Sequence, residues 1–136
     1  MNIQQATDSV RPFMAKRQLD AIRAGTHGEE KQFFITTLLE LGQTIQTMPK
    51  TYGQDGLGDQ AIVHLHYFIG NCHWWITELD IKDGVSQAFG LASLGYEPEL
   101  GYISITELTQ NGVELDLHWT AQTVQQVMAS MLSTSA

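Results

Sequence analysis

The four residues IGNC (69–72) constrain the fold more than any other part of the sequence, because they join two β-type runs through a Gly-Asn pair. Gly-Asn at such a position is typical of a two-residue hairpin turn, in which the glycine takes a positive φ. A turn of this length fixes the register of the two strands, so that Ile69 faces Cys72 and His66 faces Trp75. The sequence therefore predicts an antiparallel hairpin of known pairing.

The two faces of this hairpin differ in composition, because successive strand residues point to opposite sides. The face that resembles a protein core carries Val63, Leu65, Tyr67, Ile69, Cys72, Trp74 and Ile76. The opposite face carries His64, His66, Phe68, His73, Trp75 and Thr77. Three of the five histidines thus share one face, while the single cysteine is expected on the other as an inert core thiol.

The histidine face has two interpretations. It can be an aromatic contact surface, covered by the helices or by a partner. Alternatively, the imidazoles of His64, His66 and His73 can bind zinc or another divalent metal and leave one position open for water. Histidines on two neighbouring strands do not match an established zinc spacing, so we favour the contact surface.

Helical patterning precedes the hairpin. One helix is predicted over residues 9–23, with Pro12 in its first turn, and a second begins at a capping box formed by Thr26 and Glu29. The apolar stripe of the second helix consists of Phe34, Leu38, Leu41, Ile45 and Met48. The glycine-rich residues 51–60 then indicate a linker.

Short β-type segments follow at 61–69, 72–79, 86–94, 99–104 and 113–119. Between the last two, Ser104 and Glu107 form a second capping box, and Thr120 is positioned to cap a C-terminal helix. That helix has an apolar stripe of Val124, Val127, Met128 and Met131. We predict an α+β fold in a single domain (1–136), with an N-terminal helical pair (1–50), an antiparallel meander of four to five strands and a C-terminal helix.

Charge is distributed unevenly along the chain. Residues 1–50 contain six basic and five acidic residues, whereas residues 51–136 contain one lysine and ten acids. The β-rich part is therefore a poor nucleic-acid binder and a candidate for a basic protein partner. The single cysteine, the absence of a signal-like start and the lack of a long apolar run predict a cytoplasmic protein that does not enter a membrane.

The segment VELDLHW is a candidate for acid–base chemistry, because alternation places Glu114, Asp116 and His118 on one face. A solvated strand face explains the same pattern, unless this strand neighbours the hairpin. The sequence contains no nucleotide-binding loop, nucleophile elbow or paired-cysteine motif. An enzyme is therefore the less favoured expectation.

Three stretches carry a family resemblance: FG (89–90), PELGYISITEL (98–108) and ELDLHW (114–119). In their order and spacing, residues 62–120 resemble the family known as domain of unknown function 2958. Its members are typically small proteins of bacterial plasmids, integrative elements and phages. The resemblance singles out Glu78, Gly90, Glu99, Leu100, Gly101, Tyr102, Ser104, Glu107, Leu108, Glu114 and Asp116. The first 57 residues lie outside it, and the hairpin histidines are not part of its pattern.

These observations together predict a non-enzymatic interaction protein of a bacterial mobile genetic element, which in a sharper form counters or modulates a host nucleic-acid enzyme. The expected binding face consists of His64, His66, Phe68, His73, Trp75, Glu78, Glu99, Tyr102, Glu114 and Asp116. No cofactor is expected. The alternative is a metal-binding protein or metal-dependent enzyme that uses His64, His66 and His73. A homodimer, formed through exposed Phe68 and Trp75 and the last helix, is a further expectation.

Overall fold

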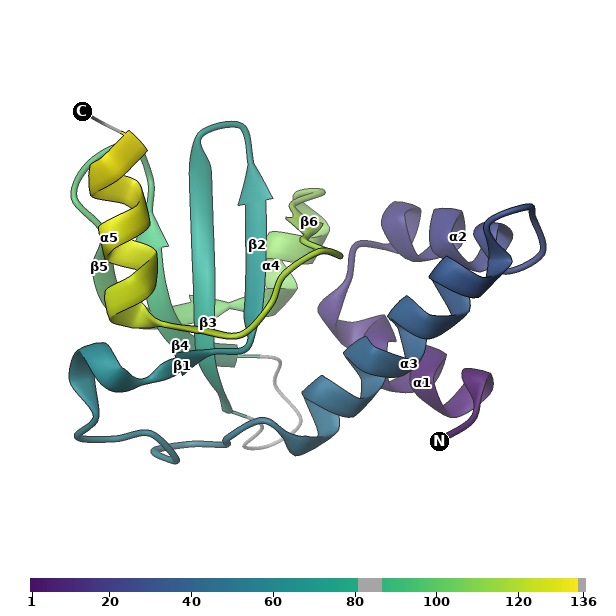
Figure 1. Cartoon of the computed structure of the whole chain (residues 1–136), viewed down its shortest axis with the longest axis horizontal. Helices are drawn as coiled ribbons and strands as arrows, with labels where there is room; N and C mark the ends of the chain where they lie inside the picture. Colours follow the sequence, from purple (N-terminus) through teal and green to yellow (C-terminus); the bar gives the residue numbers. More distant parts are fainter. Residues whose placement is uncertain (81–86, 135–136) are drawn as a thin grey trace.

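The computed structural model of the chain describes residues 1–80 and 87–134. In these residues a five-stranded antiparallel sheet, with the strand order β5-β4-β3-β2-β6, is combined with five α-helices, which confirms the α+β class. Helices α1 to α3 lie at one end of the molecule, and the C-terminal helix α5 lies on one face of the sheet (Figure 1). The predicted first residue of β4, Ser86, falls outside the described residues.

The N-terminal region is divided differently from the prediction of one helix over 9–23. It forms α1 (Ile3–Val10), a 3-10 turn (Arg11–Phe13) and α2 (Lys16–Gly25). Helix α1 starts early because Asn2 and Gln5 form a capping box, and Pro12 has no N–H to continue a helix through this point. Met14 is extended (φ −141°, ψ 140°), so the predicted single helix is wrong.

Helix α3 (Lys31–Thr47) confirms the predicted apolar stripe, although its start differs. Leu38, Ile45 and Met48 are buried in the core, and the two other members of the stripe pack against it. The capping box at Thr26 is wrong: its hydroxyl donates to the carbonyl of Arg23 at the end of α2. Glu30 precedes α3 without a side-chain cap.

The hairpin of β2 (Leu65–Ile69) and β3 (Cys72–Asp80) has the predicted register from the Ile69–Cys72 pair to the Leu65–Ile76 pair. Gly70 has a φ of 55°, as the turn requires of its first central residue. The predicted strand 61–69 is interrupted at His64, and residues Ile62–Val63 form a separate strand, β1, that pairs with β7 (Gln122–Thr123).

The last strand of the sheet returns to the hairpin. After β4 (Gln87–Ser93) and β5 (Glu99–Ser104), helix α4 (Ile105–Gln110) carries the chain across, and β6 (Glu114–Leu115) pairs with β2. Ser104 caps α4 as predicted, since its hydroxyl accepts from the N–H of Glu107, but the Glu107 side chain does not return the bond that would complete a capping box. The predicted strand 113–119 is too long, because Asp116 turns the chain by accepting the N–H of His118.

A β-bulge in β3 changes which side chains face which way. The register with β4 shifts between Ile76 and Glu78, so Thr77 is the extra residue. Without the bulge, Glu78 would follow Ile76 onto the core face; with it, Leu79 joins that core and Glu78 points to the opposite face with Phe89. Strict alternation would place Leu79 on the face that carries α5 and Glu78 in the larger core. The bulge exchanges the two, so the carboxylate lies on the α5 face.

Two apolar cores lie on the two faces of the sheet. The larger one joins α1 to α4 with one face, and includes Leu38, Tyr67 and Ile105. The smaller one lies under α5 (Val124–Thr134), whose predicted apolar stripe is confirmed. Val63 belongs to this smaller core together with Trp75, so its predicted place on the face of Leu65 and Tyr67 is wrong. Thr123 and Gln126 cap α5 reciprocally, so the predicted cap at Thr120 is wrong.

No helix within the described residues is both long and apolar enough to cross a membrane.

Candidate functional site

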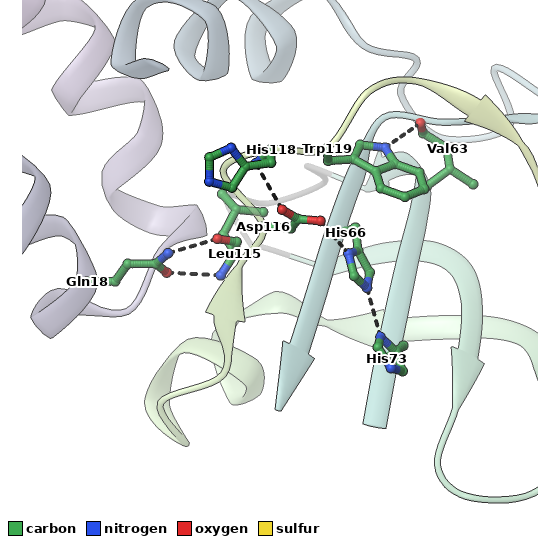
Figure 2. A network of polar contacts seen from close by, with 8 residues as sticks. All are labelled: Gln18, Val63, His66, His73, Leu115, Asp116, His118 and Trp119. Atoms are coloured by element: carbon green, nitrogen blue, oxygen red, sulfur yellow. Dashed lines mark hydrogen bonds and ion pairs between the residues drawn. The ribbon is translucent and has the colours of Figure 1, made fainter. Parts of the chain in front are cut away.

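Two groups of polar side chains lie on the sheet face that carries α5. The first is the histidine cluster, defined as His66, His73 and Asp116 (Figure 2). His66 Nδ1 lies 2.9 Å from Asp116 Oδ2, and His66 Nε2 lies 2.9 Å from His73 Nδ1. The strand of the VELDLHW segment does neighbour the hairpin, since β6 pairs with β2, and this brings Asp116 to the histidines. The rings of His66 and Trp75 are stacked, with their centroids 5.4 Å apart.

The carboxylate of Asp116 sets the proton positions in this cluster. It can only accept hydrogen bonds when ionised, so His66 Nδ1 is the donor. In neutral His66, Nε2 then accepts from His73 Nδ1. The two facing nitrogens thus share one proton, which keeps His66 Nε2 and His73 Nδ1 in contact. The cluster is thus a chain of three groups joined by two hydrogen bonds.

Burial and charge act on the histidines individually. Burial lowers the pKa of His73, and the neighbouring His66 lowers it further. Burial also lowers the pKa of His64, which lines a small cleft together with Asp116 and Trp119. His118, the third polar residue of the VELDLHW face, is exposed and stacks on Phe33 at 5.7 Å.

Metal binding by His64, His66 and His73 is not favoured by this geometry. Both ring nitrogens of His66 are already engaged, by Asp116 and by His73. In the part of the chain that the structure describes, no group of three His, Cys, Asp or Glu residues is arranged to hold a metal ion. Metal binding stays a prediction, to be tested by the metal content of protein purified without chelators.

Several expectations for the hairpin change with the structure. Trp75 is buried, with 6% of its surface exposed, because α5 covers it; it is not the exposed contact residue of a homodimer. Phe68 is half-buried and stacks on His66. Cys72 is on the face opposite the histidines, as predicted, but is only half-buried. The homodimer stays a prediction, but it can no longer rest on exposed side chains of Phe68 and Trp75.

The second group is the tyrosine pocket, a cavity of about 380 Å³ between the loop 51–60, the sheet and the start of α5. Its lining side chains include Tyr52, Glu78, Asp80, Phe89, Leu100 and Tyr102. Glu78 is 7% exposed, whereas Tyr52 and Tyr102 are 66% and 60% exposed. The pocket therefore has a carboxylate at depth and phenol rings at its mouth.

Gln54 builds the floor of this pocket, and sequence reasoning missed it. Its side-chain amide donates to the carbonyls of Ile62 (2.8 Å) and Thr77 (2.7 Å) and accepts from the N–H of Ile62 (2.6 Å). Its backbone N–H donates to Glu78 Oε2 at 2.8 Å. The bulge frees the Thr77 carbonyl for this contact. A lone glutamine in a glycine-rich loop gives no sequence signal for such a role.

The two tyrosines meet at the mouth of the pocket. The hydrogen bond between the Tyr102 hydroxyl, as donor, and Tyr52 raises the pKa of Tyr102, and the charges of Asp80 and Glu78 raise it further. Tyr52 has a φ of 63°, a conformation that costs about 1 kcal/mol or more for a residue other than glycine. The phenol is thus held over the pocket at the expense of backbone strain.

The ten residues of the predicted binding face divide between these sites. His66, Phe68, His73, Trp75 and Asp116 gather at the hairpin, with Glu114 opposite Phe68 on β6. Glu78 and Tyr102 line the tyrosine pocket, Glu99 is exposed on β5, and His64 lines a small cleft that it shares with Asp116. The structure therefore does not unite them in one surface.

Comparison with known proteins gives one match. The model of the family described as Protein of unknown function (DUF2958) matches residues 36–132, which is most of the chain. The chain belongs to this family. The match extends the resemblance seen at residues 62–120 into α3 and α5. No curated protein and no solved structure matches the DUF2958 chain.

The family region contains every residue of the tyrosine pocket and of the histidine cluster. Of the residues that the resemblance singles out, Glu78, Leu100 and Tyr102 converge on the pocket from two strands. Gly90 of this DUF2958 protein has a structural role: a Cβ built there would lie 2.0 Å from the carbonyl oxygen of Trp75. At Gly101, by contrast, nothing lies within 4 Å of a built Cβ, so close packing does not explain this glycine.

Proposed function

We propose that the protein is a non-enzymatic interaction protein that binds a basic protein partner through the mouth of the tyrosine pocket. The observation that carries this proposal is the gathering of exposed large side chains there. Tyr52, Leu100 and Tyr102, which line the pocket, expose 66%, 48% and 60% of their surface. Exposed tyrosines close together are typical of contact surfaces, because they supply large area with little conformational freedom to lose.

Charge supports a basic partner. Residues 51–136 hold ten acids and one lysine, and Glu78, Asp80 and Asp55 line the pocket itself. Such a field attracts a positively charged protein surface and repels nucleic acid.

The resemblance supplies the biological setting of the proposal, which is a bacterial mobile genetic element. In its sharper form, the partner is a host nucleic-acid enzyme whose basic surface the protein occupies and whose activity it counters or modulates. Ten acids over 86 residues are sparse for an imitation of DNA, so the proposal rests on a local contact at the pocket mouth.

Affinity capture from a bacterial host, followed by measurement with the purified partner, tests the function. We expect the double substitution of Tyr52→Ala and Tyr102→Ala to weaken binding at least about tenfold, as loss of central aromatic contacts does. Tyr96→Ala is the matched control, since Tyr96 is 79% exposed but does not line the pocket. Equal binding by all three proteins, or binding that does not weaken as salt rises, would reject the proposal.

A further inference from the structure

Glu78 is buried more deeply than a lone carboxylate usually is. Only 7% of its surface is exposed, and its Oε2 accepts a hydrogen bond from the N–H of Gln54. The ion pairs of the described residues are Lys16 with Asp20 and His66 with Asp116, so no described cation pairs with it. Burial of an ionised carboxylate is costly unless a positive charge compensates it.

The second oxygen of Glu78 is open to the pocket. Among the described residues, no fully buried side-chain oxygen or nitrogen is without a hydrogen-bond partner. The described residues give Oε1 of Glu78 no such partner, so this oxygen is reachable from the cavity that Glu78 lines. A ligand in the pocket would thus meet a preformed acceptor, held in place by the backbone of Gln54.

Aromatic rings surround this acceptor. Tyr52, Phe89 and Tyr102 line the pocket, and the rings of Phe89 and Tyr102 contact edge to face at 5.5 Å. Asp80, which also lines the pocket, accepts a hydrogen bond from the hydroxyl of Thr51 at 3.0 Å. Carboxylates combined with aromatic faces are the surroundings that cations prefer in proteins.

We infer that the tyrosine pocket binds a guanidinium group, as the end of an arginine side chain. A guanidinium is planar, so it can stack on a tyrosine ring while it donates two hydrogen bonds to a carboxylate, which the compact ammonium of lysine cannot do. A volume of about 380 Å³ admits such a side chain at full length. The inference rests on the proposed function only in naming where the guanidinium comes from, which is an arginine of the partner protein.

Titration of the ¹⁵N-labelled protein with N-acetyl-argininamide, followed by amide NMR shifts, tests the pocket directly. The Gln54 amide, which donates to Glu78, is expected to shift with a Kd on the order of 1 mM. N-acetyl-citrullinamide replaces the guanidinium with a neutral urea of the same shape, and N-acetyl-lysinamide replaces it with an ammonium. Both are expected to bind at least about fivefold more weakly. No shift with the arginine compound, or equal binding of either analogue, would overturn the inference.

Glu78→Gln is the decisive variant, because its amide oxygen can still accept from Gln54 while the charge is lost. We expect about tenfold weaker binding of N-acetyl-argininamide and an unchanged or higher Tm. Glu99→Gln removes the same charge from an exposed position outside the pocket and is expected to bind as the unchanged protein does. If Glu78→Gln fails to fold, Tyr102→Leu on the exposed mouth is expected to weaken binding about threefold. Full binding by the folded variant contradicts the inference.

The two proposals can fail separately. If N-acetyl-argininamide binds and depends on Glu78 while no partner protein binds, the pocket inference stands and the interaction function falls. If a purified partner binds through Tyr52 and Tyr102 but binds Glu78→Gln equally well, the function stands and the guanidinium inference is overturned.

Discussion

At the scale of single residues, Asp116 links the protonation of the histidines to the end of a strand. One of its oxygens accepts from His66 and the other from the N–H of His118, so the same side chain orients an imidazole and turns the chain out of β6. Gln18 adds a second local constraint from α2, since its amide donates to the carbonyl of Leu115 and accepts from its N–H. The surroundings of the histidine cluster are therefore fixed by residues from distant parts of the chain.

A pH dependence of stability follows from the histidines. The pKa values of His64 and His73 are lowered in the folded protein relative to 6.5. Below that pH the unfolded chain takes up protons that the folded chain does not, so stability is present above it and is lost on acidification. We expect the Tm to fall between about pH 7.5 and about pH 5.5, and to fall less in His73→Asn.

The control for this prediction is His27→Asn, because His27 is exposed between α2 and α3. Its Tm is expected to follow that of the unchanged protein across the same pH range. An equally steep decline in His73→Asn would show that His73 does not carry the effect.

At the scale of elements, the bulge in β3 and the glycine opposite it form one unit. Gly90 pairs with Ile76 just where the register shifts, and the carbonyl of Trp75 approaches it too closely for any side chain. This approach allows β3 to twist so that Glu78 enters the tyrosine pocket. The carboxylate in the pocket thus depends on a residue that does not touch it.

Gly90→Ala is expected to destabilise the protein by about 3 kcal/mol or more, because the new methyl group would lie against backbone that cannot move aside. Gly101→Ala is the matched control in the neighbouring strand, where a built Cβ meets nothing within 4 Å, and its effect is expected to stay within about 0.5 kcal/mol. Urea unfolding of both variants measures the difference. Similar stabilities would contradict the close approach at Gly90.

Local patterns predicted the elements that depend on local chemistry. The hairpin register followed from a two-residue turn, and the stripe of α3 and the cap at Ser104 followed from spacing. The bulge, the return of β6 to β2 and the anchoring by Gln54 depend on contacts between segments far apart in sequence, which no spacing reveals. The tyrosine pocket was missed for that reason, although Glu78 and Tyr102 were named.

At the scale of the whole molecule, the N-terminal helices and the sheet share one core. Leu38 of α3, Tyr67 of β2 and Ile105 of α4 are buried in the same cluster. The hydroxyl of Tyr67 also donates to the carbonyl of Phe13, and burial strongly raises its pKa. Separation of the helices from the sheet would therefore expose apolar surface to water and break the buried hydrogen bond of Tyr67.

Thermal unfolding is accordingly expected to be a single transition. All three tryptophans, Trp74, Trp75 and Trp119, lie in the β-rich part, so their fluorescence reports on it, whereas most of the helical signal in far-UV circular dichroism comes from residues 3–47. Shared burial requires the two signals to change at the same temperature. Two separated midpoints would show that the helices and the sheet unfold independently.

The two edges of the five-stranded sheet differ in their capacity for growth. At β6, the side chain of Gln18 satisfies the outward N–H and carbonyl of Leu115 in the manner of one more strand, whereas β5 ends the sheet on the other side. Strand addition at β5 between two copies would use the outer edge of both. The resulting ten-stranded sheet would have Gln18 at each end, so growth of the five-stranded sheet through its β5 edge would stop at two molecules.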